Sequence, residues 1–135
     1  MALQYSVAVR NAQLDAVEST AGTSAILTIR SGAPPADCAT AASGTVLATV
    51  NLPADWMNAA SSGSKTKLGT WQDASADAAG TAGHFRITDS GATTCHVQGT
   101  VTATGGGGDM TVDNAVFAVG QSFTVNTFTI SAGNA

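Results

Sequence analysis

The chain has 135 residues, a net charge of −4 and a charged fraction of 10%, far below the roughly 25% that is usual for soluble domains. Its lysines and arginines are scattered, which argues against direct binding to nucleic acid or to an anionic membrane surface. No stretch approaches the roughly 20 apolar residues of a membrane span. The length predicts one domain over 1–135, with a helical part at 1–20 and a β-rich part at 23–135.

Alanine, threonine, serine and glycine take the place of the missing charges. A hydroxyl-rich surface costs less to desolvate than one covered with lysine and glutamate. This composition favours a protein that packs against other subunits, and an ordinary secreted β-domain is the alternative interpretation. Because the first residues lack the basic and apolar stretches of a signal peptide, we expect synthesis in the cytoplasm.

Residues 3–19 are the one good helix candidate, and Gly22 is a plausible stop. Their apolar residues fall on two adjacent stripes, and a helix that is apolar on two sides needs two partners. We expect one stripe to face the chain's own sheet and the other a neighbouring subunit, unless both face a single wide groove. The first stripe comprises Leu3, Val7, Leu14 and Val17, and the second comprises Tyr5, Val9, Ala12 and Ala16.

After Gly22 the apolar period becomes two, which is typical of short β-strands. Because these strands follow one another without a second helix, we predict a mainly β, jelly-roll-like β-sandwich with one N-terminal α-helix. Residues 73–83 are expected to form a long loop. The expected strands are 24–30, 45–52, 65–71, 84–89, 95–104, 110–112, 116–119 and 121–131.

Two of these strands carry detailed expectations. In 84–89, Phe85 and Ile87 are expected to point inward, so that His84 and Arg86 point outward. In 121–131, the apolar set slips by one residue at Asn126, which predicts a bulge or a corner where the strand changes sheet.

The search for catalytic residues finds no enzyme signature. The nucleophile-elbow motif of Ser hydrolases is absent, and His84 and His96 are expected on strand surfaces. Cys95 and His96 are adjacent in a strand, so their side chains point to opposite faces and do not form a catalytic pair. The glycine run at 105–108 lacks the lysine that a phosphate-binding loop requires. We therefore expect no enzyme activity and no cofactor.

Two pairs of aspartates are weak candidates for a calcium site, Asp73 with Asp77 and Asp109 with Asp113. Neither pair fits the EF-hand spacing, and aspartate is also a common turn residue because its side chain bonds the local backbone. We expect no metal site.

The two cysteines, Cys38 and Cys95, are too far apart in sequence for a CxxC metal or redox motif. They either form a disulfide or remain two partly buried thiols. Trp56 and Trp71 are either core residues or exposed anchors for a sugar or a partner. Because Trp56 and Met57 lie in a loop of small residues, we include them among the interface candidates.

Several stretches resemble a group of small proteins encoded by tailed bacteriophages and prophages. The resemblance implies a virion structural component, and it supplies no catalytic residues. It is best matched by a capsid decoration protein on the capsid surface, which would bind the major capsid protein and associate with itself as a dimer or trimer. A tail or tail-tip component that binds a receptor or glycan is the alternative. The matching stretches are MAL-x-x-S-x-A-x-RNA-x-L-D-A (Met1 to Ala16), LATVNLP (Leu47 to Pro53), AGTAGHFRI (Ala79 to Ile87), HVQGTVTATGGGGDMTVDN (His96 to Asn114) and GQSFTVNTFTISAG (Gly120 to Gly133).

These observations give one set of candidate interface residues. It combines apolar residues from the N-terminal end of the expected helix with the two large apolar residues of the loop that carries the first tryptophan. The set is Leu3, Tyr5, Val7, Val9, Trp56 and Met57.

Overall fold

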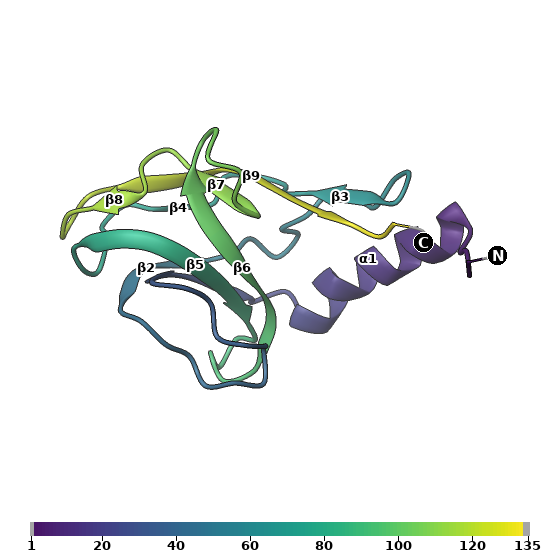
Figure 1. The fold of residues 1–135 in the computed structure, drawn as a ribbon, viewed down its shortest axis with the longest axis horizontal. Coiled ribbons are helices and arrows are strands. Elements are labelled where there is room, and N and C mark those ends of the chain that lie inside the picture. The colour runs from purple at the N-terminus through teal and green to yellow at the C-terminus, as the bar shows by residue number, and fades with distance from the viewer. Residues whose placement is uncertain (1, 134–135) are drawn as a thin grey trace.

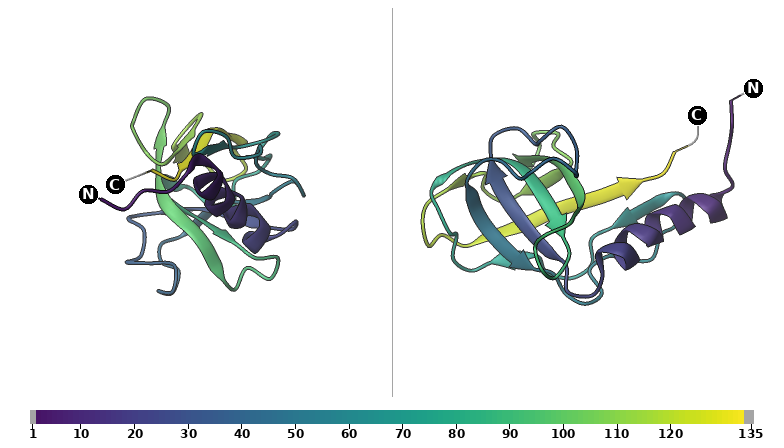
Figure 2. Two further views of the ribbon diagram at one scale, coloured as in Figure 1. Left: turned by 90° about the vertical axis from the view of Figure 1, so that its right-hand side faces the viewer. Right: turned by 90° about the horizontal axis from the view of Figure 1, so that it is seen from below.

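In the computed structural model, which describes residues 2–133, one helix projects from a mainly β body (Figures 1 and 2). The expected fold class, a mainly β sandwich-like domain with an N-terminal helix, is confirmed. Residue 1 and residues 134–135 of the expected domain lie outside the described residues. The elements are α1 (Val7–Ala21), β1 (Ile26–Ser31), β2 (Val46–Asn51), β3 (Ser64–Thr66), β4 (Gln72–Asp73), β5 (Gly80–Thr88), β6 (Cys95–Ala103), β7 (Met110–Val112), β8 (Val116–Phe117) and β9 (Phe123–Ser131).

The nine strands belong to one curled sheet in the order β2-β1-β5-β6-β7-β9-β3, and β4 pairs with β9 while β8 pairs with β5. Neighbouring strands are antiparallel except β6 and β7, which run parallel. Because the sheet curls, the part that holds β5 and β6 lies opposite the part that holds β9 (Figure 1). The core fills the space between them.

Aromatic side chains connect the two sides of this core. The ring centroid of Trp71 lies 5.9 Å from that of Trp56 and 5.6 Å from that of Phe128. Phe128 in turn meets Phe85 edge to face at 5.4 Å. These rings join β5, β9 and the segments on either side of β3 into one apolar cluster.

The bulge predicted in the last strand is confirmed. Thr111 pairs with Thr127 and Val112 pairs with Val125, so Asn126 has no partner in β7. Residues 129–131 of β9 pair instead with β3. This two-stranded ribbon extends out of the body and lies beside α1 (Figure 1).

The helix begins later than the apolar pattern predicts. The Ser6 side chain accepts a hydrogen bond from the Val9 N–H and caps the helix, so the first turn starts at Val7. The predicted stop at Gly22 is confirmed, because this residue has a φ of 94° at the C-cap, a conformation that favours glycine. Several strand boundaries also differ. The expected strand 65–71 is reduced to β3, which ends at Thr66, the expected loop 73–83 contains the start of β5, and 116–119 is a strand only over Val116–Phe117.

The outward-pointing residues of β5 are buried, which the alternation does not predict. The long connection between β1 and β2, residues 32–45, folds over the outer face of β5. His84 Nδ1 lies 2.8 Å from the Gly32 carbonyl oxygen, and Arg86 donates to the carbonyl oxygens of Cys38 and Thr40. Both faces of β5 are therefore covered, one by the core and the other by a polar loop.

Candidate functional site

Helix α1 contacts the body along one stripe that contains few apolar residues. Leu14 and Ala21 are buried, and Val17 packs partly against the core. The expected division into one covered and one free stripe is wrong for the first stripe, because Leu14 and Val17 face the body while Leu3 and Val7 are exposed. Ala12 and Ala16 of the second stripe are exposed.

Polar side chains attach the first half of the helix to the ribbon. Arg10 Nη1 donates to the Ala132 carbonyl oxygen at 3.2 Å. The backbone N–H of Gly63 donates to Asn11 Oδ1 at 2.9 Å. Because both partners are backbone groups at the ends of β3 and β9, the helix follows the ribbon.

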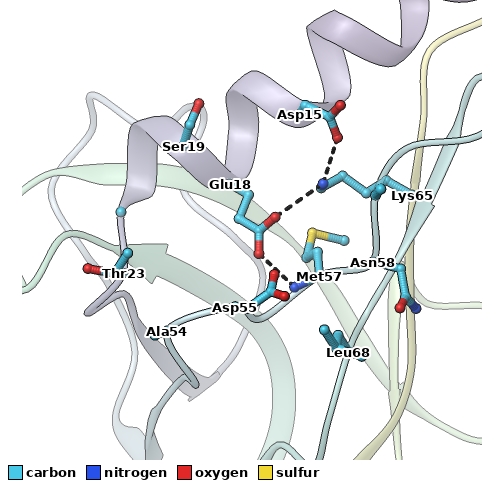
Figure 3. A pocket seen from close by; sticks show the side chains of 12 residues that line it. Asp15, Glu18, Ser19, Thr23, Ala54, Asp55, Met57, Asn58, Lys65 and Leu68 are labelled. Atoms are coloured by element: carbon cyan, nitrogen blue, oxygen red, sulfur yellow. Dashed lines mark hydrogen bonds and ion pairs between the residues drawn. The ribbon is translucent and has the colours of Figure 1, made fainter.

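The second half is attached through a buried cation, Lys65 of β3. Its Nζ lies 2.8 Å from Asp15 Oδ1 and 3.2 Å from Glu18 Oε1 (Figure 3). Burial alone would lower the pKa of Lys65, but its hydrogen bonds to Asp15 and Glu18 outweigh burial and raise the pKa. The hydrogen bonds from Lys65 and from the Ala60 N–H lower the pKa of Asp15.

Glu18 also fixes the loop that follows β2. Its Oε2 accepts the backbone N–H groups of Trp56 and Met57 at 2.9 and 2.8 Å. The Trp56 indole N–H donates to the Gly22 carbonyl oxygen. Asp15 and Glu18, which lie at the unfavourable end of the helix dipole, therefore have backbone donors and a cation as partners.

This anchoring corrects one interface prediction. Trp56 and Met57 are 0% and 1% exposed, so neither presents a side chain to a partner. The loop of small residues around them is held under α1 by Glu18 and Asp15, and Trp56 packs against Trp71 in the core. Trp71 is buried as well.

An open cavity of about 640 Å³ lies between α1 and residues 54–59 (Figure 3). Asp15, Glu18 and Lys65 line it, together with the apolar side chains of Met57 and Leu68. The ion pairs already use these charged groups, and no histidine or cysteine lines the cavity. Within residues 2–133, no group of three His, Cys, Asp or Glu side chains is placed to hold a metal ion.

The remaining predicted interface residues are exposed. They lie before and within the first turn of α1, at the end of the helix that projects from the body (Figure 2). Their exposed fractions run from 44% to 72%. We refer to them as the N-terminal apolar patch, which comprises Leu3, Tyr5, Val7 and Val9.

A second exposed apolar pair was not singled out from the sequence. Val116 and Val119 are 62% and 72% exposed, and they lie in and just after β8, at the opposite end of the molecule from α1 (Figure 1). The sequence places them in an expected strand, which suggests burial. In β8 the side chains alternate, so Phe117 is buried and Val116 is exposed, and Val119 lies beyond the strand. We refer to them as the β8 pair.

The aspartates considered for calcium bond to backbone and hydroxyl groups. Asp73 accepts the N–H of Thr49 and of Ser75. Asp109 accepts the N–H and hydroxyl of Thr100. The bond from Ser75 to Asp73 is the local turn bonding that the sequence offered as the alternative, and the other bonds join segments that are separated in sequence.

The two cysteines are free thiols whose sulfur atoms lie 3.1 Å apart. Cys38 belongs to the connection over β5, and Cys95 is the first residue of β6. Burial, together with the hydrogen bond and charge of Cys95, raises the pKa of Cys38 to about 11.

Comparison with protein families, with curated proteins and with solved structures finds no match. In the part of the chain that the structure describes, no helix is long and apolar enough to span a membrane. The site must therefore be interpreted from its own residues.

Proposed function

We propose that the chain is a structural component of a tailed-phage particle, a decoration protein that binds the major capsid protein through the N-terminal apolar patch. The observation that carries the proposal is the placement of this patch. It lies at the tip of a helix that projects from the body, where a partner can reach it from several sides (Figure 2).

The surface composition supports the same function. With a charged fraction of 10%, little ionic solvation is lost when a face of this protein is covered. Ala12 and Ala16 continue the exposed side of α1 beyond the patch, and small residues let a partner backbone approach closely. In the cavity beside α1, the charges of Asp15, Glu18 and Lys65 are used in ion pairs that hold the helix.

The size of the patch suggests how binding becomes strong. A stable interface usually buries about 800 Å² on each partner, and four side chains supply only part of that area. Several copies that associate with each other or bind adjacent capsid subunits gain avidity. A protein that binds only the assembled shell stabilises it by mass action. Association as a dimer or trimer on the capsid surface belongs to this proposal.

The structure does not provide the exposed tryptophan that the alternative, a glycan-binding tail module, requires. That module required an exposed Trp56 or Trp71 as a sugar platform, and both are buried in the core. No other aromatic cluster is exposed among the described residues. We therefore do not favour glycan binding, and a position in the tail becomes an outcome of the test below.

The test is the copy number of this protein relative to the major capsid protein in purified particles, measured by quantitative mass spectrometry. A simple ratio to the capsid subunit is expected for decoration. A few copies per particle would contradict it and would place the protein in the tail or neck. Absence from purified particles would contradict any virion function.

A further inference from the structure

We propose that Cys38 and Cys95 form an intramolecular disulfide that fastens the 32–45 connection to β6 after the protein leaves a reducing compartment. This inference does not depend on the virion function. It starts from the 3.1 Å separation of the two sulfur atoms. A disulfide bond is about 2.05 Å long, so the sulfurs must approach by only about 1 Å.

The loop is held in this position by groups other than the cysteines. Arg86 of β5 donates to the Cys38 carbonyl oxygen at 2.8 Å and to the Thr40 carbonyl oxygen at 2.9 Å. Gln98 of β6 donates to the Pro35 carbonyl oxygen at 2.8 Å. The approach of Cys38 to Cys95 therefore follows from a hydrogen-bonded frame on both sides of the thiol.

The same loop lacks apolar anchoring, which is why a covalent link would change its behaviour. None of residues 32–45 is buried, and none belongs to the core cluster. Hydrogen bonds hold it over His84 and Arg86, which are 0% and 4% exposed. Opening of the loop would expose both side chains to water.

The site is accessible to a small oxidant. A cavity of about 160 Å³ opens beside the cysteines and is lined by both of them. In thiol–disulfide exchange with oxidised glutathione, one protein thiolate attacks the reagent and releases one glutathione thiol. The second protein thiolate then attacks the mixed disulfide and releases the other. The protein loses two electrons and two protons, and the reagent gains them as two thiols.

The compartment determines when this happens. Thiols stay reduced in a bacterial cytoplasm and oxidise outside it. The raised pKa of Cys38, about 11, keeps that thiol protonated near neutral pH, which slows early exchange. Oxidation is therefore expected to accelerate as the pH rises.

The experiment treats the purified full chain with oxidised glutathione and compares it with the fully reduced chain. We expect the intact mass to fall by two hydrogen atoms, and digestion to give one peptide in which Cys38 is linked to Cys95. Both titratable thiols should disappear together. Because the link closes a loop of 57 residues in sequence separation, the midpoint of thermal unfolding should rise by about 10 °C.

Cys38→Ser and Cys95→Ser are matched controls, because each removes one sulfur and leaves a similar side chain. On treatment each can form at most a mixed disulfide with glutathione, because the second thiol is missing, so neither should show the rise in the unfolding midpoint. Should a variant fail to fold, the reduced and oxidised wild-type chains still provide the comparison. Thiols that persist in the oxidant, glutathione adducts on both cysteines, or links only between chains would each overturn the proposal.

Discussion

The β body and the helix-led end, which consists of α1, β3 and residues 129–131 of β9, are stabilised in different ways. In the body, Trp71, Phe128 and Phe85 form a chain of ring contacts inside the curled sheet. At the helix-led end, Arg10, Asn11, Asp15 and Glu18 bind backbone groups and one buried lysine. The body therefore depends on apolar burial, whereas the helix adds polar and ionic bonds to the few apolar contacts of Leu14, Val17 and Ala21.

This difference has a functional consequence. An apolar inward face on α1 would compete with its apolar outward patch for the same core, and either side could then be buried. A polar inward stripe matches only the backbone groups and Lys65 that it meets. The helix is thus fixed in one rotation against the ribbon. Val7 and Val9 lie about 200° apart around the helix, and both are exposed because the first turn extends beyond the body (Figure 2).

The largest expected loss of stability comes from removing an aromatic ring from the core of the β body. Phe128→Ala removes the ring that contacts both Trp71 and Phe85, and it should lower the free energy of unfolding by about 3–5 kcal/mol. Urea unfolding followed by tryptophan fluorescence measures this loss. Val116→Ala removes an exposed apolar side chain and should change stability by less than about 0.5 kcal/mol. Equal losses in the two variants would contradict the assigned core.

The next largest loss of stability is expected when the ion pairs that attach α1 to β3 are removed. Lys65→Met removes a buried cation that bonds two carboxylates, and it should cost about 2 kcal/mol. The loss should appear as early opening of the helix-led end, seen as faster hydrogen exchange at the backbone N–H groups of Trp56 and Met57, which Glu18 accepts. Lys67→Met is the matched control, since Lys67 bonds only a nearby carbonyl oxygen. A similar loss in both variants would show that the ion pairs do not hold the helix.

A smaller effect is expected at the helix start. Ser6→Ala removes the N-cap acceptor for Val9 and should cost about 1 kcal/mol. Fraying of the first turn would lower the helical signal in far-ultraviolet circular dichroism. Ser19→Ala alters an exposed serine that bonds within the helix and should leave that signal unchanged. The account of the helix start fails if Ser6→Ala also has no effect.

The smallest effect is the pH dependence of the attachment. The pKa of Asp15 is lowered, so its stabilising bonds are complete above its ordinary pKa of 3.8 and are lost as the pH falls through the lower folded value. The pKa of Lys65 is raised, so its contribution is complete below 10.5 and is lost as the pH rises through the higher folded value.

Acid titration of wild type against Asp15→Asn isolates the first of these groups. Asp37 and Asp89 also have lowered pKa values, but they titrate equally in both proteins. The difference in unfolding midpoint between wild type and variant should shrink below pH 3.8. A difference that stays constant through the acid range would contradict the role given to Asp15.

The sequence predicts the parts of the fold that depend on local patterns. Alternation locates β6 and the last strand, and the phase slip locates the bulge at Asn126. The apolar stripes locate the helix, but the exposed patch combines the N-terminal residues of both stripes and so does not follow from either one. In each case, the signal lies within one segment of the chain.

The sequence does not predict contacts between distant segments. Outward alternation assigns His84 and Arg86 to solvent, but a loop from residues 32–45 covers them. Trp56 looks exposed among small residues, yet Glu18 from the helix fixes its backbone inside. Lys65 looks like a surface cation because nothing near it in sequence offers a carboxylate. Pairing Lys65 with Asp15 and Glu18 requires the fold.

The most direct test of the central claim is binding to particles by variants at opposite ends of the molecule. Val7→Glu with Val9→Glu places charge in the N-terminal patch, and acidic residues in a first helical turn favour the helix dipole, so the fold should survive. Val116→Glu with Val119→Glu makes the same change at the β8 pair. Co-sedimentation with particles that lack the protein should fail for the first variant and persist for the second. Binding that persists in the first and fails in the second would contradict the claim that the helix-led end attaches this protein to its partner.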